Sequence, residues 1–272
     1  MGAVRFLEIA LFAGFGLALN VAAAYAAFRR GTVSGSGAVA GMVVGAAIFL
    51  GGGLAYWLML MLFFVSSSVA GRVGSRRRPS FERMHERGNR RDFVQVAANG
   101  GVAAVAAVLL RLTGNPVFGL SAAGALAAAT ADTWASELGV LSRRRPRSIV
   151  TWRELEPGTS GGVSPLGSLA AAAGSLVIAS FFVLVETRVA AVPALAFVWG
   201  AGLAGMTLDS LLGATVQAQY RDDQERLTER RAGDDGPHQL VRGRPSITND
   251  TVNVLSVLCA AVIASLAGML GV

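Results

Sequence analysis

The sequence contains little charge and almost no cysteine. Only 15% of its 272 residues are charged, the basic residues are all arginines, and the single cysteine is Cys259. A soluble domain of this size carries about a quarter charged residues, whereas this chain is 53% hydrophobic with a mean hydropathy of +0.53. The composition excludes an ordinary soluble domain, and one cysteine excludes an internal disulfide or a cysteine-built metal site. We expect an integral membrane protein.

Long apolar runs divide the chain into about eight segments that approach the roughly 20 residues needed to cross a bilayer. We predict an all-α, polytopic transmembrane bundle that forms one domain over residues 1–272. The predicted helices are 5–28, 35–52, 54–71, 93–112, 117–140, 163–186, 192–217 and 248–270, the second and third separated only by Gly51, Gly52 and Gly53. The first run could also be a cleaved signal, but its length and the following Arg29 and Arg30 favour a retained span. Frequent small residues predict tight helix packing.

The arginines alternate between the connecting segments. All but three of the 24 lie in one set of loops, and the exceptions are Arg5, Arg111 and Arg188. Cytoplasmic loops of membrane proteins carry an excess of basic residues, so we place the arginine-rich loops in the cytoplasm of a cell (inner) membrane protein and both termini on the opposite side. Arginines spread over loops in this way indicate topology and lipid headgroups rather than a nucleic-acid surface.

Four acidic residues stand out in the predicted spans: Asp132, Glu137, Asp209 and Asp250. An ionised side chain in the bilayer core costs about 2.5 kcal/mol or more, so each is a functional hypothesis. Asp132, Asp209 and Asp250 are predicted to lie at one depth in the cytoplasmic half, where a divalent metal or folded-over loop arginines would compensate their charge. Glu137 follows Asp132 by about 140° of helical rotation, so the two need not face one ligand.

Polar side chains fall at the same predicted level. Helical spacing places Arg91 on one stripe with Asn99, Ser136 on one face with Asp132, and Asn249 beside Asn253. Arg90 and Arg91 lead into that stripe and are candidates for binding a substrate phosphate. The alternative is that such groups, taken singly, only form hydrogen bonds between helices.

A glycine-rich segment precedes the sixth predicted helix. It supplies Gly158, Thr159, Ser160, Gly161, Gly162 and Ser164. Successive backbone amides, hydroxyls and a helix N-terminus together can hold a phosphate, although such a segment is often only a turn and a helix cap. Beside carboxylates suited to Mg²⁺ and nearby arginines, it indicates a phosphoryl-transfer site for a lipid.

The motifs Ala131–Gly139, Pro157–Ser164, Asp209–Thr215 and Asn249–Asn253 resemble those of the integral-membrane family called domain of unknown function 92, which includes a plant phytyl-phosphate kinase. The order of motifs is more distantly similar to that of the CTP-dependent dolichol and phytol kinases. The resemblance implies transfer of a phosphoryl group from a nucleoside triphosphate, CTP or ATP, to a prenyl monophosphate of the phytyl, farnesyl or geranylgeranyl type.

Together these observations assign an expected role to each residue. Asp132, Glu137 and Asp209 are the expected catalytic residues, Asp132, Asp209 and Asp250 the Mg²⁺ ligands, and the polar stripe with the glycine-rich segment the phosphate-binding groups. Asp132 or Glu137 would serve as a base if the acceptor were an alcohol, whereas an anionic phosphate acceptor needs none. The sequence leaves two alternatives open: a lipid or ion transporter or flippase with an intramembrane acidic site, and a non-catalytic scaffold.

Overall fold

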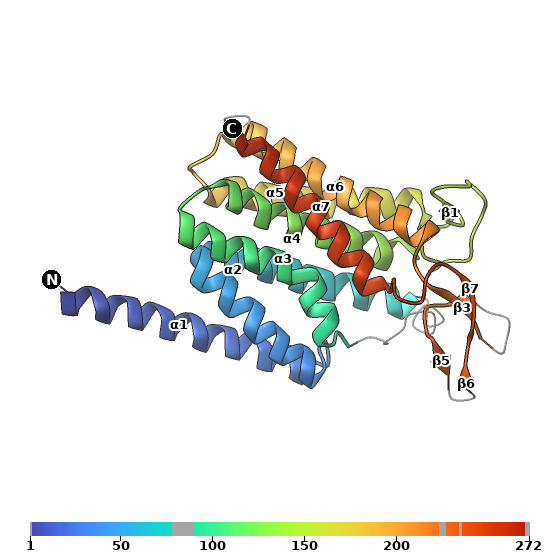
Figure 1. The fold of residues 1–272 in the computed structure, drawn as a ribbon, viewed down its shortest axis with the longest axis horizontal. Helices are drawn as coiled ribbons and strands as arrows, with labels where there is room; N and C mark the ends of the chain where they lie inside the picture. Colours follow the sequence, from blue (N-terminus) through green and yellow to red (C-terminus); the bar gives the residue numbers. More distant parts are fainter. Residues whose placement is uncertain (1, 78–89, 223–226, 234–235, 270–272) are drawn as a thin grey trace.

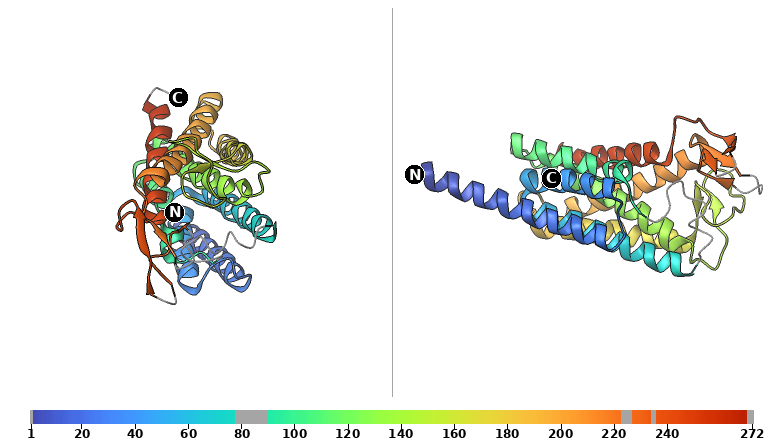
Figure 2. Two further views of the ribbon diagram at one scale, coloured as in Figure 1. Left: turned by 90° about the vertical axis from the view of Figure 1, so that its right-hand side faces the viewer. Right: turned by 90° about the horizontal axis from the view of Figure 1, so that it is seen from below.

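The computed structural model describes residues 2–77, 90–222, 227–233 and 236–269, and seven α-helices run through these ranges. They pack side by side into one elongated bundle (Figures 1 and 2). The helices are α1 (Gly2–Arg29), α2 (Gly35–Arg77), α3 (Phe93–Thr113), α4 (Val117–Gly139), α5 (Pro165–Val185), α6 (Ala191–Thr215) and α7 (Asn249–Met269). Most predicted helix ends fall within a few residues of these bounds.

Helix α2 contains two of the predicted helices and folds back on itself at Gly53. There the backbone takes φ 76° and ψ −169°, outside the helical range, which glycine adopts without steric cost. A straight helix of 43 residues would be about 65 Å long. Instead Gly37 near its start lies against Arg91, and Gly74 near its end lies against Glu137, which interacts electrostatically with the same Arg91. Both ends of α2 are therefore at one end of the bundle.

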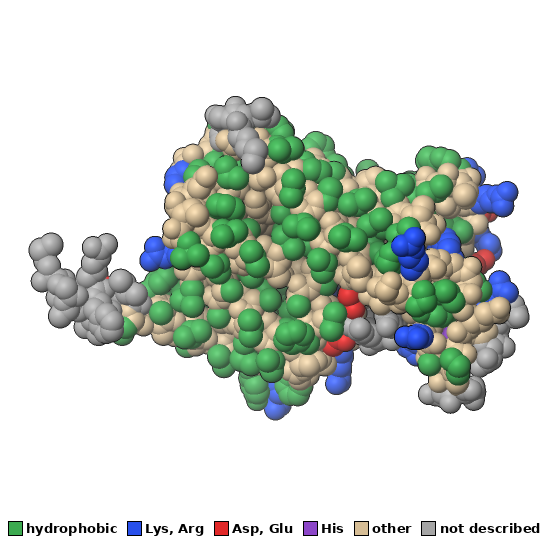
Figure 3. Space-filling view, in the orientation of Figure 1, with side chains coloured by type: hydrophobic (Ala, Val, Ile, Leu, Met, Phe, Trp, Pro, Cys, Tyr) green, Lys and Arg blue, Asp and Glu red, His purple; other side chains and the backbone are tan. Residues whose placement is uncertain are grey.

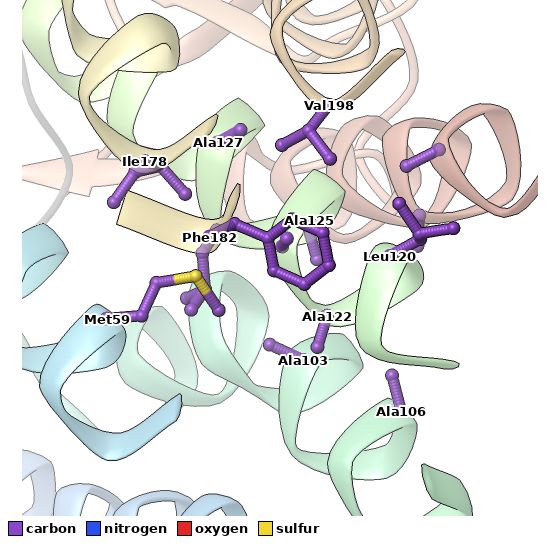
Figure 4. Close-up of a cluster of buried hydrophobic side chains, with 14 of the residues drawn as sticks. Met59, Ala103, Ala106, Leu120, Ala122, Ala125, Ala127, Ile178, Phe182 and Val198 are labelled. Atoms are coloured by element: carbon purple, nitrogen blue, oxygen red, sulfur yellow. The ribbon is translucent and has the colours of Figure 1, made fainter. Parts of the chain in front are cut away.

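Helix α4 occupies the centre of the bundle. Its residues from Ala122 to Ala131 are all buried, and α2, α3, α5, α6 and α7 all pack against it. Glycines permit these close approaches, because a Cβ atom at Gly124 would lie 2.7 Å from the Ala260 carbonyl oxygen and one at Gly202 would lie 2.9 Å from the Ala127 Cβ. Figure 4 shows the alanines of α3 and α4 meeting larger side chains such as Phe182, Ile178 and Met59. The expected packing by small residues is confirmed.

Six of the described helices are long and apolar enough to cross a membrane. The reversed helix α2 counts once among them, as the 40 residues Gly35–Gly74, and the alanine-rich α4 is not among them. Large apolar side chains are exposed on the outside of the bundle, for example Phe15, Leu169, Leu184 and Val192, and hydrophobic side chains are spread over the whole bundle on the face seen in Figure 3. Such a surface suits contact with lipid rather than water.

The all-α prediction needs a correction at the arginine-rich end. The segment 217–244, which apart from its first residue was expected to be a loop, contains five short strands: β3 (Gln219–Arg221), β4 (Leu227–Thr228), β5 (Ala232–Gly233), β6 (Gly236–Pro237) and β7 (Gln239–Arg242). β3 is the middle strand between β4 and β7, and β5 pairs with β6. We call this segment the β-lobe. Two further strands, β1 (Arg147–Ser148) and β2 (Gly162–Val163), pair next to it. The strands are too short to give a period-2 signal, but Tyr220 and Thr228 are buried.

Candidate functional site

A polar cavity of about 450 Å³ lies at the arginine-rich end of the bundle, where α4 and α6 end and α3, α5 and α7 begin. We call it the polar cavity. Segments far apart in the sequence meet around it. The lining residues include fourteen of the predicted site residues: Arg91, Asn99, Asp132, Ser136, Glu137, Gly158, Thr159, Ser160, Gly161, Gly162, Ser164, Asp209, Asn249 and Asn253.

Two predicted site residues are not part of that lining. The guanidinium of exposed Arg90 lies beside Gly31, where its Nε would be 3.5 Å from an added Cβ. Asp250 is buried in the first turn of α7. Asp250 was predicted to share a metal with Asp132 and Asp209, and Arg90 was predicted to bind a substrate phosphate together with Arg91. The structure gives neither residue a place on the cavity wall.

Carboxylates from three segments approach one another at the polar cavity. Asp209 of α6 interacts electrostatically with Asp132 of α4 and with Glu229 of the β-lobe. Ser256 of α7 donates a hydrogen bond to Asp209 Oδ2 at 3.4 Å. Asp132 and Asp209 are each near the end of a helix that runs toward the arginine-rich end, as their positions in the sequence predicted. Like charges gathered in this way repel unless a cation accompanies them.

Glu229 is a site residue that the sequence did not reveal. Ser160 Oγ donates to its Oε1 at 2.5 Å, Gln217 Nε2 donates to the same oxygen at 2.8 Å, and Gln217 Nε2 also lies 3.1 Å from Ser160 Oγ. All three residues line the polar cavity. In the sequence Glu229 is one acid among alternating acids and arginines, so no local pattern distinguishes it. Its hydrogen bonds attach the β-lobe to the glycine-rich segment.

The glycine-rich segment forms a tight loop on the cavity wall. Gly158 and Gly161 have φ values of 92° and 81°, which side chains with a Cβ rarely adopt. The amides of Thr159 and Gly162 donate to carbonyls within the loop, at Glu156 and Thr159. Ser164 caps α5 by accepting a hydrogen bond from the Gly167 amide at 3.1 Å, so its hydroxyl has a structural role.

The hydroxyl of Thr159, in the same glycine-rich loop, has no hydrogen-bond partner in the described part of the chain. Thr159 Oγ1 is buried and makes no hydrogen bond to any described residue, although Thr159 lines the polar cavity. A buried polar group normally has a partner. Thr159 therefore offers a donor and an acceptor to a molecule in the cavity.

Arg91 contributes positive charge on the opposite wall. Its Nη1 atom is buried and has no hydrogen-bond partner among the residues placed by the structure, and its guanidinium lies over the rings of Phe63 and Phe64, 5.9 and 5.6 Å from their centroids. Burial lowers the pKa of Arg91, and the negative charge of Glu137 opposes that shift. Arginine stays protonated in proteins nonetheless, so Arg91 presents a charged donor without an acceptor.

Two of the predicted polar residues also make local hydrogen bonds. Asn99 Nδ2 donates to the Gln95 carbonyl at 3.0 Å, and Ser136 Oγ donates to the Asp132 carbonyl at 3.0 Å. The Ser136 hydroxyl proton and one of the two Asn99 amide protons are used within the helices, while the oxygens of both side chains remain as acceptors for a ligand. The expected polar stripe is present, but hydrogen bonds within the helices leave it fewer free donors than its spacing suggested.

A second buried acid, also missed by the sequence reasoning, lies at the other end of the bundle. Glu186 follows α5 and is 5% exposed. It accepts hydrogen bonds from Tyr56 Oη at 2.8 Å, Arg188 Nε at 2.7 Å and Arg188 Nη2 at 2.6 Å. Burial by itself raises the pKa of Glu186, but the hydrogen bonds from Arg188 and Tyr56 outweigh it and lower the pKa overall.

The residues of the polar cavity fit Mg²⁺ in the way phosphate-transferring enzymes use it. The described residues hold no cluster of three or more His, Cys, Asp or Glu side chains arranged for a metal. Mg²⁺, however, is usually held by one or two carboxylates together with substrate phosphates and water rather than by a cage of side chains. Asp132 and Asp209 supply two carboxylates, and side-chain hydroxyl and amide oxygens that line the same cavity, such as those of Ser160 and Asn253, are further oxygen ligands.

Comparison with known proteins identifies the family. The sequence profile of the family described as integral membrane protein DUF92 matches residues 18–261. The chain belongs to this family. It is 30% identical to Protein PGR of Arabidopsis thaliana over 283 aligned positions, which cover 94% of this chain and 96% of that protein. It is 32% identical to the uncharacterized membrane protein MJ0933 of Methanocaldococcus jannaschii over 66% of this chain and 73% of that protein.

These matches confirm the resemblance inferred from the motifs and establish a multi-pass integral membrane protein. The names of these two relatives state no activity. No solved structure matches the chain.

Proposed function

We propose that this protein is a prenyl-phosphate kinase, which transfers the terminal phosphoryl group of CTP or ATP to a membrane-bound prenyl monophosphate. One observation carries the proposal: a single cavity at the end of an apolar bundle combines two helix-borne carboxylates, Asp132 and Asp209, with a glycine-rich loop and the buried guanidinium of Arg91. Phosphoryl transfer depends mainly on positioning and on neutralising charge, and these groups supply both.

Each wall of the polar cavity would have its own task. Asp132 and Asp209 would hold Mg²⁺ together with the donor phosphates, and the ion would supply neutralisation of phosphate charge. Thr159 and the loop around it would bind a donor phosphate, and Arg91 would bind the acceptor phosphate. Ser160, Gln217 and Glu229 would keep the loop in position through their hydrogen bonds.

The reaction requires no covalent bond between the substrate and the protein. A non-bridging oxygen of the acceptor monophosphate forms a bond to the γ-phosphorus while the bond from that phosphorus to the β,γ-bridging oxygen breaks. The products are a prenyl diphosphate and a nucleoside diphosphate. The acceptor oxygen is already anionic at neutral pH, so no general base is required. Glu137, which interacts electrostatically with Arg91, would then orient that guanidinium rather than remove a proton.

The orientation in the membrane is part of the proposal. The helix connections that surround the polar cavity carry most of the arginines, so the positive-inside rule places the cavity at the cytoplasmic face, where nucleotides are available. With α2 crossing twice, the chain would span the bilayer eight times, and both termini would lie on the other side.

A transfer assay tests the proposal. Purified protein in detergent with Mg²⁺, labelled CTP or ATP and farnesyl or phytyl monophosphate should yield labelled prenyl diphosphate, and the Asp209→Asn variant should not. Omission of Mg²⁺ should abolish the product. If no prenyl monophosphate is phosphorylated by either nucleotide, the kinase proposal is wrong, and the same acidic cavity would instead favour a transporter.

A further inference from the structure

A second cavity, apolar and of about 320 Å³, lies among α1, α2 and α3. We call it the apolar groove. Its wall consists mainly of small and apolar side chains, including Ala23, Ala27, Val44, Leu60, Phe64 and Val96. A groove of this size is in the range that encloses a small ligand.

The apolar groove and the polar cavity meet. Eight residues line both: Arg30, Thr32, Ser68, Arg72, Arg91, Gln95, Asn99 and Thr133. All eight are polar, whereas the part of the groove that the polar cavity does not share is almost entirely apolar, with Asn20 as its one polar side chain. Asn20 already bonds the Met42 carbonyl and the Trp57 indole. The groove is therefore apolar along its length and cationic at the junction.

We propose that the apolar groove holds the isoprenoid chain of the acceptor, and that Arg91 at the junction binds its phosphate. This inference rests on the proposed function and names the site for each part of the substrate. An amphiphile with one anionic end matches the arrangement of charge: its hydrocarbon chain replaces water in the groove, and its phosphate meets the guanidinium nitrogen that has no partner within the described residues. Phe63 and Phe64 line the groove, and the same guanidinium lies over their rings.

Gly41 allows the groove to be blocked with little disturbance of the protein. It lines the apolar groove, and a Cβ added there would meet no atom within 4 Å. A leucine side chain at this position should therefore extend into the groove. Gly101 of α3 offers a matched control, because its Cβ would also meet nothing within 4 Å but it is not part of the groove wall.

Photo-crosslinking locates the chain without depending on catalysis. Full-length protein in detergent would be irradiated with farnesyl monophosphate carrying a diazirine on its last isoprene unit, and the labelled peptides identified by mass spectrometry. We expect labels on groove residues of α1, α2 and α3. Labelling should fall slightly in Gly41→Ala and several-fold in Gly41→Leu, and should be unchanged in Gly101→Leu. Size-exclusion chromatography and thermal unfolding would verify that all variants are folded.

Binding of the phosphate is tested separately with labelled farnesyl monophosphate and labelled farnesol. Arg91→Gln should weaken binding of farnesyl monophosphate about tenfold or more, because it removes a charge-assisted hydrogen bond, and should leave farnesol binding unchanged. Equal loss for both ligands would overturn the assignment of Arg91.

Three results would overturn the groove assignment: labels confined to α5 or α6, unchanged labelling in a folded Gly41→Leu variant, or competition by phosphatidylglycerol as effective as that by unlabelled farnesyl monophosphate. The last would identify a site for bulk lipid. Labels in the groove without any phosphoryl transfer would leave this assignment standing and reject the kinase proposal, so the two failures can be told apart.

Discussion

Two buried acidic sites at opposite ends of the bundle differ in how their charge is balanced. Glu186 has a matched cation and three side-chain hydrogen bonds, from Tyr56 and Arg188. Asp209 has two other carboxylates, Asp132 and Glu229, as its electrostatic neighbours and one long hydrogen bond from Ser256. The charge of Glu186 is balanced by another residue of the protein, whereas the site around Asp209 gathers negative charge on the wall of a cavity. A buried acid indicates a ligand only when its own surroundings leave its charge uncompensated.

The largest expected effect concerns the uncompensated site. Asp209→Asn should lower the transfer rate at least about 100-fold, because the variant loses a carboxylate that would hold the metal and the donor phosphates. Stability should be unchanged or higher, since the substitution removes repulsion between like charges. Initial rates and thermal unfolding in the same detergent would test both statements. Wild-type transfer by the variant, or a marked loss of stability, would reduce Asp209 to a structural residue like Glu186.

Glu186→Gln should show the opposite behaviour. It leaves the Arg188 guanidinium without its partner, so the free energy of unfolding should fall by about 1–3 kcal/mol, while the transfer rate per folded molecule stays near that of the wild type. Chemical or thermal unfolding measures the first quantity. Glu154→Gln is the control, because the Glu154–Arg147 pair is 3.8 Å apart and more than half exposed, and such pairs contribute at most about 1 kcal/mol.

A moderate effect is expected where the β-lobe meets the glycine-rich loop. Glu229→Gln keeps the size of the side chain but removes the charge that accepts hydrogen bonds from Ser160 and Gln217. The glycine-rich loop should become less rigidly positioned, and the transfer rate should fall about tenfold, because small displacements of positioning groups are costly to the rate. Steady-state kinetics with varied nucleotide would show a raised KM for the donor. An unchanged KM would place Glu229 outside donor binding.

The smallest expected effect is the pH dependence of the compensated site. The pKa of Glu186 is lower in the folded protein than its ordinary value, so the ionised form stabilises the fold above about pH 4.5, and this contribution is lost as the pH falls through the lowered folded value. The difference in thermal midpoint between wild type and Glu186→Gln should therefore shrink between pH 6 and pH 3. A constant difference would show that the destabilisation does not come from ionisation.

Much of the bundle follows from hydrophobic length alone. Apolar runs bounded by arginines predicted each helix within a few residues at most ends, and the three glycines at 51–53 correctly marked the reversal within α2. Acids within apolar runs are costly and therefore conspicuous, which is why Asp132 and Asp209 could be placed near one cavity from the sequence.

The rest of the site depends on contacts that leave no local pattern. Glu229 reaches the cavity only because the β-lobe folds over it, and the strands that carry it are two to four residues long. Asp250 begins α7 at the end of the bundle where the cavity lies and is buried, but it is not among the residues that line the cavity. Glu186 is the last residue of the predicted helix 163–186, and its partner Tyr56 is 130 residues away in the sequence, so no local pattern marked the pair.

The central position of α4 has a consequence for how the protein is made. Its faces are covered by α2, α3, α5, α6 and α7, and it is not among the six described helices that are long and apolar enough to cross a membrane. A nascent chain that ended after α4 would therefore hold this helix in the bilayer only weakly, since small side chains gain their stability from neighbouring helices rather than from lipid. The helix that carries Asp132 would therefore depend on segments synthesised after it for a stable place in the bilayer.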